Sequence, residues 1–545
     1  MLLTDLIATF KTYIRWILVA LPVLLSMPLH AQFYDGTHVD FGKNRVQYTT
    51  FDWQFFRFQD YEVYFYKGGQ DLAKYTARYV NKRIPELEKK LDYFLDERIQ
   101  IIIYNKQSHF EQSNIGLTTD EVYNIGGVTQ IVGSKLFIFF EGDYAKFHEQ
   151  IDKGISKVLI YQMMYGGNWR QVLKNSTLLR LPEWYIDGFL SYISSPDDPY
   201  IQSRIKDGIE SGLFDKFNRL QDEEAVIAGH SMWNYIADTY GENVFSNILY
   251  MTRITRDIDD GFLFVIGVDF KQFTEDWLTY YKNMYRSDTR TTHSTGNQLE
   301  MKVKKNRVYQ NLVPNPTENM VAYSSNIDGQ IRIFLYDIEA GKRKKIFKKG
   351  HRLDRITDYS YPLLAWHPTG KALAFIMEIQ GEPSLYMYNL EEKEMTIQPL
   401  FGMEKVLSID FSDNGRQMVF SAMLDGQSDI YLYNLIGNTQ QKITNDKYDD
   451  LDAVFINKSS QISFVSNRTL GKEAALDSVV KMPEEKDVFV YDISTKTIRN
   501  VTETPGKSEF QPMNLNGNLS FLSPKDLLMS RYVAEFDSSI SHIDT

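Results

Sequence analysis

Residues 181–194 of the chain read LPEWYIDGFLSYIS. Large apolar side chains recur in this stretch at steps of three and four residues, the spacing that lines one face of a helix. They are Trp184, Ile186, Phe189, Leu190 and Ile193. Pro182 suits the start of a helix, where its missing N–H costs nothing. The stretch therefore predicts a packed helix, and its Asp187 carboxylate, set among apolar neighbours, needs a partner.

Periodicity also predicts the elements before this helix. Apolar runs predict strands, and apolar residues at helical spacing predict helices. The strands are expected at 61–66, 98–104 and 135–140, and the helices at 72–95 and 144–165. Pro85 falls inside the first helix and is expected to kink or split it. The order strand, helix, strand, strand, helix predicts an α+β layout with the helices on one side.

The segment from Pro182 to Tyr192 resembles the P-x-W-x-x-E-G-x-x-x-Y segment of the gluzincin metallopeptidases, specifically the peptidase-MA-like family. The resemblance extends over roughly residues 50–286, including a later helix at 230–240 and a closing helix at 269–285. It implies a zincin-like α+β domain. It also implies that Asp187 stands where the family has its third zinc ligand.

The other zinc-site positions of that family are degenerate in this chain. The resemblance places Lys153, Gly154 and Lys157 where the family has H-E-x-x-H. A protonated lysine has no lone pair for a metal, and glycine has no side chain to act as a base. We therefore interpret the domain as a catalytically inactive pseudo-metallopeptidase without metal or cofactor. We expect the ammonium of Lys153 or Lys157 to pair with Asp187 where zinc would sit.

A second arrangement stays open at this stage. His148 and Asp152 read as H-E-x-x-D and, together with Asp187, offer one imidazole and two carboxylates, which zinc accepts. An active metallopeptidase with an atypical site is therefore the alternative. The competing interpretation is that 148–152 is a solvated helix start of mixed charge. His230, which follows Gly229 at the start of a predicted helix, is expected to be a surface or capping residue.

From residue 309 onward the sequence repeats itself. A strand ending in Tyr-Asp or Tyr-Asn recurs at intervals of 52, 45 and 58 residues. These pairs are Tyr336-Asp337, Tyr388-Asn389, Tyr433-Asn434 and Tyr491-Asp492. A period near fifty, with strands and tight turns inside it, is typical of β-propeller blades. Asp-Gly pairs such as Asp328-Gly329 and Asp425-Gly426 supply the positive φ angles that tight hairpins need.

The repeats resemble TolB-like β-propeller blades. A fifth unit begins at 516–522, so 309–545 is expected to hold about four and a half blades, arranged about an axis. TolB-like rings usually have six, so we expect the chain to be part of a longer protein. The acidic clusters at 257–260 and 449–452 lack the spacing of a calcium loop and are expected to be solvated turns.

The ends and the composition set limits on function. Residues 1–31 read as an export signal, with Lys11 and Arg15 before an apolar run, and an uncleaved anchor is the rival reading. Residues 32–286 form the predicted α+β domain, and the polar stretch 287–308 is the predicted linker. A net charge of −11 argues against nucleic-acid binding, and the absence of cysteine excludes disulfides.

The predicted architecture is multidomain: an α+β zincin-like domain plus an all-β propeller with TolB-like blades. An exported chain of this kind resembles periplasmic and outer-membrane proteins of the Bacteroidota. The expected function is a non-catalytic periplasmic or outer-membrane scaffold or adaptor that binds envelope proteins. A glycan- or peptidoglycan-binding propeller is a further alternative, and association with the outer membrane or with peptidoglycan fits either of these binding functions.

Overall fold

The computed structural model describes a defined part of the 545 residues. The described residues are 47–113, 130–132, 134–166, 181–286, 299, 301–304, 306–352, 358–469, 481–515, 517–525 and 528–534. The predicted signal at 1–31 and most of the predicted linker at 287–308 lie outside them. Across the described residues, no helix combines the length and the apolar character that a membrane crossing requires.

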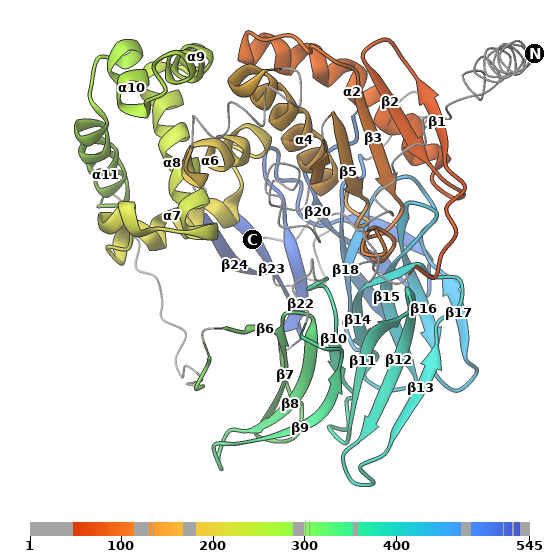
Figure 1. Cartoon of the computed structure of the whole chain (residues 1–545). Coiled ribbons are helices and arrows are strands. Elements are labelled where there is room, and N and C mark those ends of the chain that lie inside the picture. The colour runs from red at the N-terminus through yellow and green to blue at the C-terminus, as the bar shows by residue number, and fades with distance from the viewer. Residues whose placement is uncertain are drawn as a thin grey trace, which may run out of the picture. The chain divides into compact units, whose positions relative to one another are not determined.

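A mixed five-stranded sheet forms the base of the N-terminal region, which is residues 47–286 (Figure 1). Its strands are β1 (Gln54–Arg57), β2 (Tyr61–Phe65), β3 (Ile99–Tyr104), β4 (Gln130–Val132) and β5 (Lys135–Phe139). The order across the sheet is β1-β2-β3-β5-β4, with β2, β3 and β5 parallel and both edge strands antiparallel. The three predicted strands are confirmed to within a residue at each end.

Helices make up most of the remainder of this region. They are α2 (Gln70–Leu91), α3 (Gln107–Phe110), α4 (Tyr144–Tyr165), α6 (Glu183–Ser194), α7 (Pro199–Glu210), α8 (Asp222–Tyr240), α9 (Phe245–Thr255), α10 (Ile258–Ile266) and α11 (Phe270–Arg286), with short 3-10 helices at Phe214–Arg219 and Glu242–Val244. The predicted split at Pro85 is wrong, because α2 runs through it as one helix. Tyr79, Ile84 and Leu87 are buried on both sides of the proline. That burial offsets the one helical hydrogen bond that proline cannot donate.

The helix that carries Asp187 packs between two others, as Figure 1 shows for α4, α6 and α8. The predicted contact between α4 and α6 is confirmed. On its other side α6 approaches α8 backbone to backbone, because a Cβ on Gly188 would lie 2.6 Å from the Cα of Gly229. Two glycines at the crossing therefore set how closely these helices approach.

Gly229→Ala is expected to destabilise the chain by about 3 kcal/mol, the upper range for overpacking. The added methyl would overlap the carbonyl oxygen of Trp184, which is backbone and cannot turn aside. Chemical denaturation measures the effect. Gly437→Ala is the control, because its added Cβ meets no atom closer than 3.5 Å, and we expect a change below about 0.5 kcal/mol there. Equal losses in the two variants would contradict the proposed crossing.

Five separate sheets follow, which Figure 1 shows in green to blue. The first four have four strands each, and the fifth has three among the described residues. Their strands are β6–β9 (Val308–Pro314, Met320–Ile327, Gln330–Asp337, Lys342–Lys349), β10–β13 (Leu363–Trp366, Ala372–Ile379, Glu382–Asn389, Met395–Pro399), β14–β17 (Lys405–Phe411, Gln417–Leu424, Gln427–Asn434, Thr439–Lys442), β18–β21 (Asp450–Ile456, Gln461–Ser466, Asp487–Asp492, Thr497–Asn500) and β22–β24 (Phe510–Leu515, Asn518–Lys525, Leu528–Ala534). All neighbouring strands within a sheet are antiparallel.

These sheets are the blades of a β-propeller, hereafter the propeller (residues 306–534). The first strands β6, β10, β14, β18 and β22 contact one another in chain order, which confirms the repeat reading. Hydrogen bonds join neighbouring blades, since the amides of Ala453 and Phe455 donate to Ser408 and Asp410 of the preceding blade. The predicted hairpins are also confirmed, with positive φ at Asp328 and Asp425 and at the glycine after each. The propeller has five blades, where four and a half were expected.

Candidate binding site at the junction of the two regions

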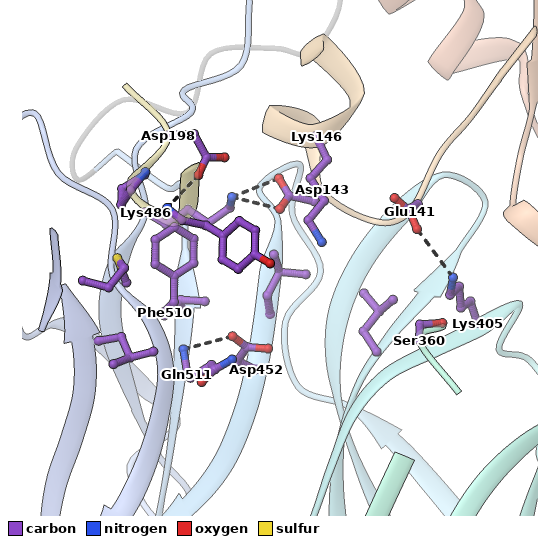
Figure 2. Close-up of a pocket in the computed structure, with 17 residues that line it drawn as sticks. Glu141, Asp143, Lys146, Asp198, Ser360, Lys405, Asp452, Lys486, Phe510 and Gln511 are labelled. Atoms are coloured by element: carbon purple, nitrogen blue, oxygen red, sulfur yellow. Dashed lines mark hydrogen bonds and ion pairs between the residues drawn. The ribbon is translucent and has the colours of Figure 1, made fainter. Parts of the chain in front are cut away.

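A cavity of about 470 Å³, the junction pocket, lies between the N-terminal region and the inner strands of the propeller. Figure 2 shows charged side chains converging on it from both regions. Its lining is Glu141, Asp143, Lys146, Asp198, Pro199, Tyr200, Ser360, Lys405, Leu407, Leu451, Asp452, Val465, Lys486, Phe510, Gln511, Leu522 and Met529. The helix starts of α4 and α7 thus face the channel side of three blades.

The start of α4 is tied to the fourth blade by a buried ion pair. The Nζ of Lys486 lies 2.9 Å from an Asp143 carboxylate oxygen, and both side chains are less than a tenth exposed. Asp143 also caps α4 by accepting the amide of Ala145. Burial alone would lower the pKa of Lys486, but Asp143 and Asp449 raise it, so the ammonium stays charged. Lys486 of the propeller therefore neutralises Asp143, the acidic residue that caps α4 in the N-terminal region.

Asp449 completes this junction from the propeller side. Its carboxylate accepts the amide of Tyr144 at 2.7 Å and the side-chain N–H of Asn467. Burial raises the pKa of Asp449 well above its usual value, and the negative charge of Asp143 raises it further. Asp449 therefore holds its proton more tightly than Asp143 does. The bonds that Asp449 accepts therefore tie the first turn of α4 to the fourth blade.

The expectation that 449–452 is a solvated turn is wrong. Asp449 and Asp450 are fully buried. The Nη2 of Arg468 donates to both carboxylate oxygens of Asp450, and this charged contact supplies the partner that a buried acid needs. The partners of Asp449 and Asp450 lie 18 or more positions away along the chain, so the sequence of the acidic cluster does not reveal that these two residues are buried.

A second buried lysine links the third blade to the same helix start. Lys405 has an almost fully buried side chain, and its Nζ lies 3.1 Å from Asp358 and 4.0 Å from Glu141. Close by, the Nζ of Lys106, which precedes α3, donates to the backbone oxygens of Gly381 and Glu404. Lys405 and Lys486 thus bring the charges of the propeller against those of the N-terminal region at two places in the pocket lining.

His148 belongs to this junction as well. Its Nε2 lies 2.6 Å from the hydroxyl of Tyr75, and its Nδ1 lies 2.8 Å from a carboxylate oxygen of Glu484 in the propeller. Its side chain is buried and its ring stacks on Tyr79 at 4.3 Å between centroids. Asp152 is buried too, where it accepts from Tyr79 and pairs with Arg83. The solvated helix start expected for 148–152 is therefore wrong, because α2 and the propeller cover it.

The structure does not bring the alternative ligand set together. His148 and Asp152 contact α2 and the propeller, whereas Asp187 contacts Lys157 at 3.3 Å. Over the described part of the chain, no group of three His, Cys, Asp or Glu side chains is arranged to hold a metal ion.

The expected ion pair at Asp187 is present. The Lys157 side chain is 1% exposed and that of Asp187 is 24% exposed. Burial lowers the pKa of Lys157 to about 8, and Asp187 opposes that shift. Gly154 faces the sheet, where an added Cβ would overlap the side chain of Leu136 in β5. A side chain at 154 would therefore be directed at β5.

His230 is another residue whose surroundings the sequence did not reveal. It was expected at a helix start on the surface, but α8 begins at Asp222 and His230 is fully buried within it. Its Nδ1 lies 3.0 Å from the hydroxyl oxygen of Ser191, and burial lowers its pKa to about 4. It is a neutral core residue that links α6 to α8.

The junction pocket combines an apolar wall with charges that are largely paired. Phe510, Leu522 and Met529 supply part of the wall. Of the lining lysines, Lys405 and Lys486 have carboxylate partners, and Lys146 is exposed. A site with apolar walls and a few polar groups is suited to holding a ligand.

No family model matches the chain. A search of curated proteins finds the Tol-Pal system protein TolB of Helicobacter hepaticus, 33% identical over 87 residues, which are 16% of this chain and 20% of that protein. The match therefore spans about a fifth of the length of the curated relative.

Solved structures with similar folds include TolB from Acinetobacter baumannii (15% identity, 42% of this chain, 55% of that chain, TM-score 0.30) and a putative TolB from Agrobacterium tumefaciens (18%, 34%, 62%, TM-score 0.28). Together with the sheets described above, the sequence match makes residues 306–534 a five-bladed, TolB-like β-propeller joined to a largely helical N-terminal region.

Proposed function

We propose that this chain is a non-catalytic scaffold of the cell envelope, in the periplasm or at the periplasmic face of the outer membrane, which binds envelope proteins through both of its regions. In this proposal the N-terminal region is a peptidase-MA-like domain that has lost its zinc site. The ion pair between Lys157 and Asp187 is the observation that carries the proposal.

The chemistry of that pair explains the loss of activity. In the proposed alignment, Lys157 replaces a histidine ligand and points its ammonium at the remaining acid. A buried cation at this place repels a second cation, and zinc-dependent hydrolysis requires a bound, metal-activated water. Gly154, at the position of the catalytic base, has no side chain and packs against Leu136.

The propeller and the junction support a binding role. Buried ion pairs at Lys405 and Lys486 fix the N-terminal region against the third and fourth blades, which holds the junction pocket open as a preformed surface. The similar protein from Helicobacter hepaticus is named as part of the Tol-Pal system. We extend an envelope-protein partner to this chain on that basis.

Purified chain incubated with zinc and then desalted is expected to retain less than stoichiometric metal. Inductively coupled plasma mass spectrometry measures the bound zinc. The control is Asp152→Ala, which removes the last acid of the H-E-x-x-D stretch. Its zinc content should equal that of the unmodified chain. One zinc per chain, lost in Asp152→Ala or Asp187→Ala, would instead support the atypical metallopeptidase.

Photo-crosslinking tests the binding role. A photoreactive residue replaces Tyr200, which lines the junction pocket and is 57% exposed, and a second variant carries it at Phe94, which is 73% exposed and is not part of the pocket lining. We expect envelope-protein adducts from position 200 only. Equal adducts at both positions, or none, would contradict binding at the pocket, and adducts with glycan strands alone would favour the peptidoglycan-binding alternative.

A further inference from the structure

The first blade (β6–β9) carries an excess of positive charge in an acidic chain. Residues 306–352 include nine Lys or Arg and four Asp or Glu, although the whole chain has a net charge of −11. Six of the nine basic residues lie in β9, whose sequence is KRKKIFKK. Lysines on an outer strand discourage edge-to-edge pairing of sheets. That role accounts for lysines in β9, but it does not account for the arginines on other segments of the blade.

One face of this blade brings basic residues of different strands together. Arg332 of β8 lies directly opposite Ser325 of β7 and Lys348 of β9, so these three side chains share a face. The adjacent β8 residues Ile333 and Leu335 belong to the core shared with the second blade, so the face of Arg332 points away from that blade. Like charges directly opposite each other destabilise a sheet. The pairing of Arg332 with Lys348 therefore costs stability in the absence of an anion.

Three further arginines lie near Arg332. Arg307 precedes β6, Arg352 follows β9, and Arg343 of β9 lies over the ring of Phe334 at 5.3 Å. Burial lowers the pKa of Arg332, and the positive charges of Arg307, Arg352 and Arg343 lower it further. None of the four arginines forms an ion pair with a carboxylate in the part of the chain that the structure describes.

This face also holds hydrogen-bond donors that are not used. The Nε–H groups of Arg307 and Arg332 are buried, yet neither has an acceptor among the described residues. The hydroxyl of Ser325 is buried and likewise has no partner there. Arg332 donates only from its Nη2, to the side chain of Gln330. Buried donors without acceptors, set among cations that repel one another, lose stability on both counts unless an anion binds.

We propose that this surface of the first blade, the arginine face, binds a phosphomonoester group. The Nε–H groups of Arg307 and Arg332 and the hydroxyl of Ser325 donate to the phosphate oxygens. A phosphomonoester carries nearly two negative charges and three acceptor oxygens at neutral pH, whereas a carboxylate carries one charge and two oxygens. Three donors and several cations therefore match phosphate better than carboxylate. The arginine face consists of Arg307, Ser325, Arg332, Arg343, Lys348 and Arg352.

The phosphate group can belong to a soluble phosphorylated molecule or to a lipid headgroup, because both present the same oxygens. Arg343, Lys348 and Arg352 are exposed, so the arginine face is accessible from solvent. The inference goes beyond the scaffold function, and it depends on neither the junction pocket nor the lost zinc site.

The probe is inorganic phosphate, titrated into the full chain at pH 8 and followed by isothermal titration calorimetry. Arg332→Met removes the charge and the donors but keeps the apolar stem, and its affinity should fall about tenfold or more, as for the loss of a charged hydrogen bond. Lys344→Met is the matched control, because Lys344 lies opposite Leu335 and contacts Tyr388 of the second blade. It should bind phosphate normally. Equal losses in the two variants, or no saturable binding, would overturn the proposal.

Two other variants separate recognition from folding and from net charge. Arg332→Lys keeps the charge but lacks the guanidinium fork, so it should not restore the affinity. Ser325→Ala removes one donor without changing the charge and should weaken binding several-fold. Phosphate should raise the Tm of the unmodified chain and of Lys344→Met, but not that of Arg332→Met. If Arg332→Met is unstable without phosphate, Ser325→Ala carries the test, and unchanged affinity in that variant would overturn the proposal.

Two comparisons identify the ligand chemistry and its source. Acetate should bind about tenfold or more weakly than phosphate, since it accepts fewer charged hydrogen bonds, and equal affinities would overturn the phosphate assignment. Vesicles made of equal parts phosphatidylcholine and phosphatidic acid are then compared with a soluble hexose phosphate. Tighter binding to the vesicles would identify a lipid headgroup, and tighter binding to the hexose phosphate a soluble ligand. Either result supports the proposal only if Arg332→Met abolishes it, and binding that persists in this variant would overturn it.

Discussion

Lys486→Met is expected to destabilise the chain by roughly 3–5 kcal/mol, the cost of leaving a buried charge without its partner. Lys486 neutralises Asp143 at 2.9 Å and faces Asp449, which is fully buried. Methionine fills the space of the lysine stem but leaves the buried Asp143 carboxylate without its ion-pair partner. Urea denaturation at pH 8 measures the loss. We also expect a separate first transition as the two regions uncouple.

The size of this loss depends on pH. Burial would raise the pKa of Asp143, but Lys486 and Lys146 hold it below its usual value, so its stabilising contribution is present above about pH 4 and is lost as pH falls further. Without Lys486, burial raises the pKa of Asp143, so the cost is greatest when the group is ionised. The difference between variant and unmodified chain should therefore shrink from pH 8 to pH 5.

Lys481→Met is the matched control in the same segment. Lys481 pairs with Glu484, but both side chains are more than two fifths exposed. Exposed pairs contribute about 0–1 kcal/mol, so this variant should lose less than about 1 kcal/mol. A loss in Lys486→Met no larger than in Lys481→Met would show that the junction is hydrated and does not bind the two regions together.

Asp187→Ala is expected to destabilise the chain by roughly 3 kcal/mol, at the lower end for a broken buried pair because Asp187 is 24% exposed. The Lys157 ammonium would remain in a site that is 1% exposed. Lys157→Met should lose less, because the carboxylate left behind can reach water. Thermal and urea denaturation of both variants and of the double variant give the coupling between the two residues.

The pH dependence distinguishes the loss of an ion pair to the buried Lys157 ammonium from a simple loss of packing. Lys157 has a folded-state pKa of about 8, below that of an unfolded lysine, so the cost of burying its charge is full below that pH and falls as pH rises from there toward the unfolded value of about 10.4. Removing Asp187 lowers this pKa further. The loss in Asp187→Ala should therefore be smaller at pH 9.5 than at pH 7. A loss that does not change with pH would contradict the ion pair.

The elements of this fold are predictable because their signals are local. Apolar spacing placed α4 at 144–165 without error, and the Tyr-Asp and Tyr-Asn repeats identified the blades. The Lys157–Asp187 pair was also expected, since it needed only two neighbouring helices and one acid in apolar surroundings. The count of five blades was missed because the last repeat lacks the Tyr-Asp ending and a fourth strand among the described residues.

The sequence by itself determined five helices of the first region, the repeated hairpins of the second, and the absence of any disulfide, whereas α7, α9 and α10 were not predicted. Only the tertiary structure decided which charges are buried. His148, Asp449 and Lys486 look like solvated polar residues in their own segments, yet His148 meets Glu484 and Tyr144 meets Asp449 across more than 300 positions of the chain. Burial is a property of what packs on a side chain, and for these residues the covering partner comes from another region, so no local pattern records it.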